Sequence, residues 1–147
     1  MCSDRLQRRE FITLLGGAVA WPLAARAQQA GKLSIVGYMG SATPATQGQW
    51  AAAFAQRLRE LGWIEGRTIA VEYRWAEGRT ERAAEIAAEF VQRRVDVIVT
   101  SGTGIVLAAK QATSVIPIVF AAAGDPVGTG LVASLARPGG NVTGLSN

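Results

Sequence analysis

The fold class is decided by the stretch Val95-Asp96-Val97-Ile98-Val99-Thr100-Ser101-Gly102-Thr103-Gly104. The β-forming residues up to Thr100 predict a buried strand. The small polar residues that follow predict a turn into a helix over Ile105–Thr113. A strand, turn and helix in this order are typical of a parallel sheet, in which the helix crosses back to start the next strand.

The same alternation continues on both sides of this unit. Before it, we expect strands and helices over Leu33–Met39, Pro44–Leu61, Thr68–Trp75 and Thr80 to about Arg93. After it, we expect a strand, a short helix and a fifth strand over Ile118–Ala121, near Leu131–Leu135 and from Val142. The sequence therefore predicts an α/β fold for residues 28–147, with a parallel sheet and flanking helices.

Two of the expected helices carry an apolar stripe at helical spacing. The stripe of the first is Ala51, Phe54, Ala55, Leu58 and Leu61, and that of the second is Ala84, Ile86, Ala87, Phe90 and Val91. Thr80 is expected to cap the second helix. These stripes predict that both helices pack against the sheet.

Residues 1–27 have the three parts of an export signal. Arg8 and Arg9 precede Phe11, an apolar segment runs to Ala24, and Ala25-Arg26-Ala27 has a small residue on each side of the arginine. The alternatives are a membrane anchor and a buried core helix, but a bilayer span needs roughly 20 apolar residues. We expect a twin-arginine signal peptide that is cleaved before Gln28, and a periplasmic mature protein.

The composition excludes several classes of function. The chain has 147 residues, no histidine and one cysteine, Cys2. Without histidine, serine–histidine and cysteine–histidine catalysis are excluded within this chain, and the commonest metal ligand is absent. We expect no cofactor and no metal. The formal net charge of +4 gives too small a basic field to favour a nucleic-acid partner.

Three small, polar loops follow expected strands, and each leads towards a helix N-terminus. The candidate ligand-binding residues in them are Ser41, Ala42, Ser101, Gly102, Thr103, Ala122, Ala123 and Asp125. Ligands of open parallel sheets bind at the carboxyl ends of the strands. Helix N-termini there suit a ligand carboxylate, and Asp125 suits a ligand ammonium.

Each loop also has a structural interpretation. Ser101–Gly104 is equally a turn with a helix cap, and Asp125-Pro126 is a common way to begin a helix. Trp50, Trp63 and Trp75 are assigned to packing rather than to ligand stacking.

Several longer strings resemble one family. They include Arg8-Arg9-Glu10-Phe11-Ile12, Val71-Glu72-Tyr73-Arg74-Trp75-Ala76-Glu77-Gly78 and Asp125-Pro126-Val127-Gly128. The most distinctive is Ser134-Leu135-Ala136-Arg137-Pro138-Gly139-Gly140-Asn141-Val142-Thr143-Gly144. Through these strings the chain resembles the ABC-transporter substrate-binding, tryptophan-binding-protein-like family.

The resemblance implies one lobe of a type I periplasmic-binding-protein fold, in which two α/β lobes close over a small solute such as an amino acid. It also implies a partner, the ABC permease in the inner membrane. Family members are longer and contain both lobes, so we expect the second lobe to be absent from this chain. The resemblance implies a transport protein and not an enzyme.

Two other classes of protein are alternatives to this interpretation. One is a fragment of a secreted α/β enzyme, and the absence of a nucleophile–base pair argues against it. The other is a response-regulator-like signalling lobe, which the export signal disfavours.

Overall fold

A five-stranded parallel sheet organises residues 32–146, the part of the chain that this computed structural model describes. Its strands are β1 (Ser34–Gly40), β2 (Ile69–Trp75), β3 (Val97–Thr100), β4 (Ile118–Ala123) and β5 (Val142–Ser146). They lie in the order β2-β1-β3-β4-β5, and each neighbouring pair is parallel. The predicted α/β class is confirmed. The expected signal residues Arg8, Arg9, Phe11, Ala25 and Ala27 lie outside the described residues.

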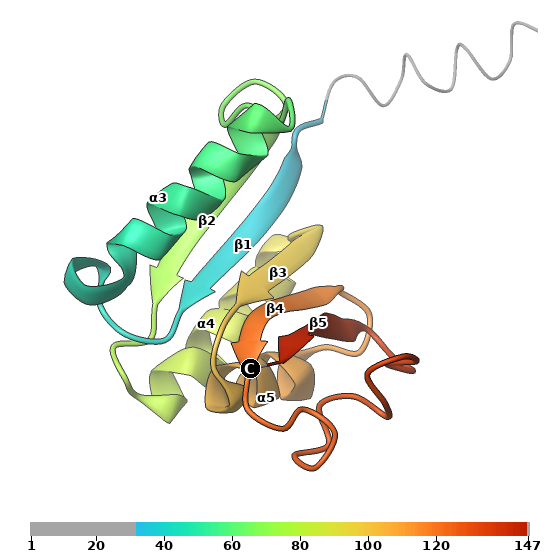
Figure 1. Cartoon of the computed structure of the whole chain (residues 1–147). Helices are drawn as coiled ribbons and strands as arrows, with labels where there is room; N and C mark the ends of the chain where they lie inside the picture. The colour runs from blue at the N-terminus through green and yellow to red at the C-terminus, as the bar shows by residue number, and fades with distance from the viewer. Residues whose placement is uncertain (1–31, 147) are drawn as a thin grey trace, which may run out of the picture. The chain divides into compact units, whose positions relative to one another are not determined.

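Helices flank the sheet on both faces. They are α3 (Pro44–Glu60), α4 (Thr80–Arg93) and α5 (Thr103–Ala112). Figure 1 shows α3 over β1 and β2 on one face, and α4 and α5 together on the other. Among residues 32–146, no helix has the length and apolar character needed to cross a bilayer.

Each face of the sheet has its own apolar packing. On the α3 face, the Tyr38 ring contacts three other aromatic rings. Its centroid lies 5.6 Å from that of Phe54, 5.5 Å from that of Tyr73 and 5.8 Å from that of Trp75. On the other face, the fully buried Phe90 of α4 fills the space above Gly37. A Cβ at Gly37 would lie 2.7 Å from the Phe90 ring, so this position of β1 has no room for a side chain.

Two details of α4 differ from the prediction. The N-cap residue is Arg79, which makes no capping hydrogen bond through its side chain, and Thr80 is already the first residue of the helix. The buried stripe contains Ala83 in place of Ala84, because Ala84 faces solvent. Ala83 and Ala84 are equivalent in size and polarity, so only the packing against the sheet decides between them.

The prediction of a helix near Leu131–Leu135 is wrong. That segment consists of bends and irregular backbone, with Leu131 and Val132 buried and Leu135 62% exposed. The Val132 N–H donates to Pro126 O at 3.1 Å and the Ala133 N–H donates to Pro138 O at 3.0 Å. The backbone groups that a helix would have used are therefore paired across a loop.

Asp96 delays the start of β3, which begins at Val97 and not at Val95. The Asp96 N–H donates to Ile35 O at 2.8 Å, and its Oδ2 accepts from the Ile35 N–H at 2.7 Å. The N–H and the carboxylate of Asp96 therefore both pair with the backbone of β1.

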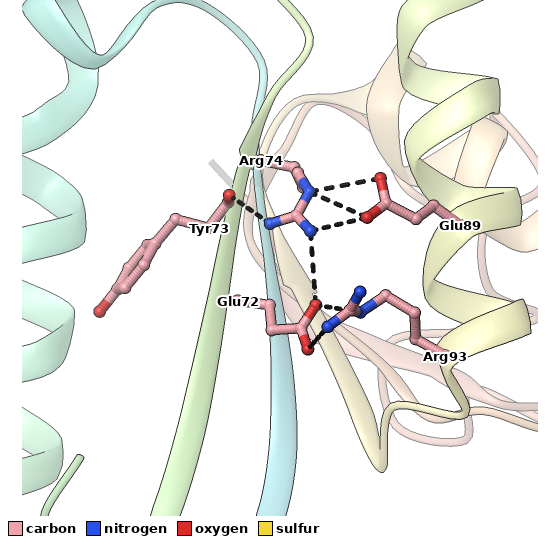
Figure 2. Close-up of polar contacts among 5 residues, drawn as sticks. All are labelled: Glu72, Tyr73, Arg74, Glu89 and Arg93. Carbon is pink, nitrogen blue, oxygen red and sulfur yellow. Dashed lines mark hydrogen bonds and ion pairs between the residues drawn. The ribbon is translucent and has the colours of Figure 1, made fainter. Parts of the chain in front are cut away.

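Four charged side chains join β2 to α4 (Figure 2). Arg74 donates to Glu89 through Nε at 3.1 Å and through Nη2 at 2.6 Å. Arg93 donates to Glu72 Oε1 through Nη2 at 2.7 Å. The buried Glu72 Oε2 has no well-oriented donor, but Arg93 Nε lies 2.6 Å away and balances its charge. The network holds the edge strand β2 to the helix behind it.

This network predicts a loss of stability in acid. The Arg74 guanidinium, by hydrogen bonding, holds the pKa of Glu89 below its usual value of 4.5. A carboxyl whose pKa is lower in the folded state stabilises the fold above its unfolded pKa and stops doing so as the pH falls through the folded pKa. We expect the stability difference between the unmodified chain and Glu89→Gln to be constant above about pH 5 and to shrink below pH 4.5. Urea unfolding at a series of pH values measures this, and a difference that does not change with pH would contradict it.

Candidate ligand-binding cleft

A cleft of about 470 Å³ opens where β1, β3 and β4 end. Its lining is Tyr38, Ser41, Gln47, Trp50, Phe54, Val99, Thr100, Ser101, Gly102, Thr103, Ala121, Ala122, Ala123 and Gly124. The carboxyl ends of parallel strands meet at one edge of a sheet, so loops that are far apart in sequence form one site.

The structure brings six of the eight predicted residues together in this cleft. They are Ser41, Ser101, Gly102, Thr103, Ala122 and Ala123. Ala42 and Asp125 do not line it. The Ala42 N–H donates to Gln47 Oε1 at 3.0 Å, and Asp125 Oδ1 accepts from the Gly128 N–H at 2.9 Å. Ala42 is therefore paired with helix α3, and Asp125 is paired within its own turn.

The N-terminus of α5 forms one wall of the cleft. Gly102 is the N-cap of α5 and has a φ of +86°, a conformation that favours glycine. Its N–H donates to Ala122 O at 2.7 Å, and Thr103 Oγ1 donates to Gly124 O at 3.3 Å. These bonds tie the second loop to the third. The amides of Thr103 and Gly104 are in the first turn, where the backbone N–H groups and the helix dipole favour an anion.

Ser41 and Gln47 also line the cleft. Gln47 Nε2 donates to Ser41 Oγ at 2.7 Å, which leaves the hydroxyl hydrogen of Ser41 available to a ligand. Gln47 belongs to α3, and its side chain therefore joins this helix to the loop after β1. The cleft therefore has a hydrogen-bond donor at the Ser41 hydroxyl in addition to the amides of the α5 N-terminus.

Three aromatic side chains form an apolar wall: Tyr38, Trp50 and Phe54. Trp50 is 54% exposed. Burial raises the pKa of Tyr38 above its usual 10.0, so its phenol is neutral at physiological pH. A flat apolar group is the kind of ligand surface that such a wall contacts best.

Eight lining residues were not among the predicted ones, and four of these carry large side chains: Tyr38, Gln47, Trp50 and Phe54. Gln47, Trp50 and Phe54 are spaced three and four apart on α3, so they share one face of the helix. The available signal was that Phe54 belongs to the predicted apolar stripe and that Gln47 and Trp50 share its face of the helix.

The lining of the cleft is uncharged. Among residues 32–146, no group of three or more histidine, cysteine, aspartate or glutamate side chains is placed to hold a metal ion. The chemistry that the cleft offers is therefore hydroxyl and amide hydrogen bonding at one end and aromatic contact at the other. It suits a small molecule with an apolar body and a polar or anionic end.

A parallel α/β layer with such a cleft defines one lobe of a type I periplasmic-binding-protein fold, and solved structures agree. The L-Trp complex of an ABC domain from Streptococcus pneumoniae matches with a TM-score of 0.71 at 26% identity, over 78% of this chain and 39% of that one. A conserved domain protein from Vibrio cholerae matches with a TM-score of 0.73 at 36% identity, over 79% of this chain and 39% of that one.

The chain belongs to the ABC transporter substrate binding protein family, whose profile matches residues 46–147. The tyrosine-binding protein of Clostridioides difficile (strain R20291) is 38% identical over 94 residues, which are 64% of this chain and 27% of that protein. The chain thus spans about a quarter of the length of this curated relative. The family consists of substrate-binding proteins of transporters.

Proposed function

We propose that this chain supplies the first lobe of a solute-binding protein for an ABC-type uptake system, and that it binds a small solute such as an amino acid. The observation that carries the proposal is the uncharged cleft. It combines the α5 N-terminus, suited to a carboxylate, with the wall of Tyr38, Trp50 and Phe54. Membership of the family and the L-Trp bound to the Streptococcus relative support the same class of solute.

The export signal and the transport partner belong to the same proposal. We infer that Arg8, Arg9 and Phe11 direct export, that cleavage after Ala27 releases the mature protein into the periplasm, and that the ABC permease of the inner membrane receives the solute. The order of basic, apolar and small-residue regions in the sequence supports this inference.

Thermal unfolding with and without candidate solutes tests the proposed function. A ligand that binds only the native state stabilises it by about 2.7 kcal/mol at a concentration of 100 times its Kd. We expect L-tryptophan, L-tyrosine or a related aromatic carboxylate to raise the unfolding midpoint of the chain in a concentration-dependent way. A cooperative transition that no amino acid or small carboxylate shifts would contradict solute binding by this lobe.

Trp50 is expected to contribute directly to that affinity. Trp50→Ala removes the exposed ring from the cleft and should weaken binding of an aromatic solute about tenfold, a typical effect of losing one aromatic contact. Trp63→Ala is the matched control, because Trp63 is similarly exposed, at 49%, but does not line the cleft. Isothermal titration of the two variants measures this. Equal losses of affinity in the two variants would show that Trp50 does not contact the solute.

A further inference from the structure

Both ends of helix α5 are hydrogen-bonded to the segment Ala122–Leu131, which contains the cleft loop after β4. At its N-terminus, the Gly102 N–H donates to Ala122 O and Thr103 Oγ1 donates to Gly124 O. In its last turn, Lys110 Nζ donates to Gly130 O and to Leu131 O. The segment Ala122–Leu131 therefore begins in the cleft wall, leaves it in a turn and is fastened again to the same helix.

Asp125 closes the turn between these two attachments. Its carboxylate Oδ1 accepts from the Gly128 N–H at 2.9 Å. Its carbonyl accepts from the Thr129 N–H at 3.0 Å and from Thr129 Oγ1 at 2.7 Å. The φ of Asp125 is +38°, in the left-handed region, so the chain reverses at this residue.

Gly128 has no room for a side chain, because of the same carboxylate. A Cβ built there would lie 2.0 Å from Asp125 Oδ2 and 2.7 Å from its Cγ. Any larger residue at position 128 would force the carboxylate to rotate away and break its bond to the Gly128 N–H. Asp125 and Gly128 therefore form one unit.

We propose that Asp125 is a positioning residue of the cleft, which sets the path of Ala122–Gly124 through its turn and does not itself contact the solute. This inference rests on the proposed function for its binding readout. Two observations carry it. Asp125 is absent from the cleft lining, and its carboxylate is engaged with Gly128. The neighbouring residues Ala122, Ala123 and Gly124 do line the cleft.

The two roles of Asp125 differ in the response to Asp125→Asn. Asparagine keeps an oxygen that accepts the Gly128 N–H but removes the negative charge. A positioning residue predicts that Asp125→Asn binds L-tryptophan about as well as the unmodified chain, and that Asp125→Ala weakens L-tryptophan and indole-3-propionate by the same factor. A direct contact to the ligand ammonium predicts that Asp125→Asn loses affinity for L-tryptophan only, because indole-3-propionate has no ammonium. That second result would overturn the proposal.

A second readout needs no ligand. In NMR spectra of the full chain, we expect Asp125→Ala and Gly128→Ala to shift the amide signals of Ala122 and Gly124 and to speed amide exchange at position 128 about tenfold. Both changes break the same hydrogen bond to the Asp125 carboxylate. The signal shifts and the exchange rate of the double variant should therefore be no larger than those of the more strongly affected single variant. Unmoved Ala122 and Gly124 signals in Asp125→Ala would refute the positioning role. Failure of the unmodified chain to bind either compound would refute the proposed function, and the NMR result would still decide the role of Asp125.

Discussion

Replacing Phe90 with alanine is expected to lower the free energy of unfolding by about 3–5 kcal/mol, the usual cost of truncating a buried phenylalanine. The Phe90 ring is fully buried between α4 and the sheet, and it fills the space above Gly37. Domains of this size are stable by only about 5–15 kcal/mol, so the variant should unfold at a much lower urea concentration.

Gly37→Ala provides the matched test of this contact. Alone, its Cβ would meet the Phe90 ring at 2.7 Å and should destabilise the chain. Combined with Phe90→Ala, the same methyl group enters the vacated space, so the double variant should be more stable than the sum of the two single losses predicts. Strict additivity in urea unfolding would show that the ring does not pack on Gly37.

Removing both arginines from the network in Figure 2 is expected to have the second largest effect. The variant with Arg74→Ala and Arg93→Ala removes both cations next to the Glu72 carboxylate, whose side chain is only 16% exposed in the unmodified chain. An unpaired buried charge typically costs 3–5 kcal/mol, and partial access to solvent lowers this, so we expect a loss of about 2–3 kcal/mol in urea unfolding at pH 7.

Adding Glu72→Gln to that double variant separates charge from packing. If the loss comes from the uncompensated carboxylate, the neutral amide should restore part of the stability, although it makes no new ion pair. Glu60→Gln is the control at an exposed carboxylate of α3, and it should restore nothing. A triple variant that is no more stable than the double would mean that the arginines act through packing of their side chains.

The sequence predicted the sheet because strand signals are local. The apolar run in Val97–Thr100 and the helical spacing in α3 fix an element type without reference to the rest of the chain. The errors fell where local signals are balanced. Ala83 and Ala84 have the same helix propensity and hydrophobicity, so local sequence cannot distinguish them. The sequence of Leu131–Leu135 predicted a helix, but two of its backbone N–H groups pair with Pro126 and Pro138.

The candidate site divides in the same way. Ser101, Gly102 and Thr103 were predictable, because a polar turn after a parallel strand must lie at the carboxyl edge of the sheet. Asp125 was expected to point towards a ligand. Its carboxylate is instead paired with the Gly128 N–H, three residues further on. The pairing of this carboxylate with Gly128 depends on the reversal of the chain at Asp125, which the sequence did not predict.

The order of the five strands and of helices α3, α4 and α5 along the chain, the parallel α/β class and the three loops at one edge could all be predicted from the sequence alone. All of these follow from hydrophobic periodicity and turn chemistry over a few residues. The tertiary structure alone decided that Trp50, Gln47 and Phe54 of α3 line the cleft, and that Asp125 does not. The physical reason is that the rotation of a helix and the partner of a carboxylate depend on contacts between residues far apart in the chain, and periodicity does not encode these contacts.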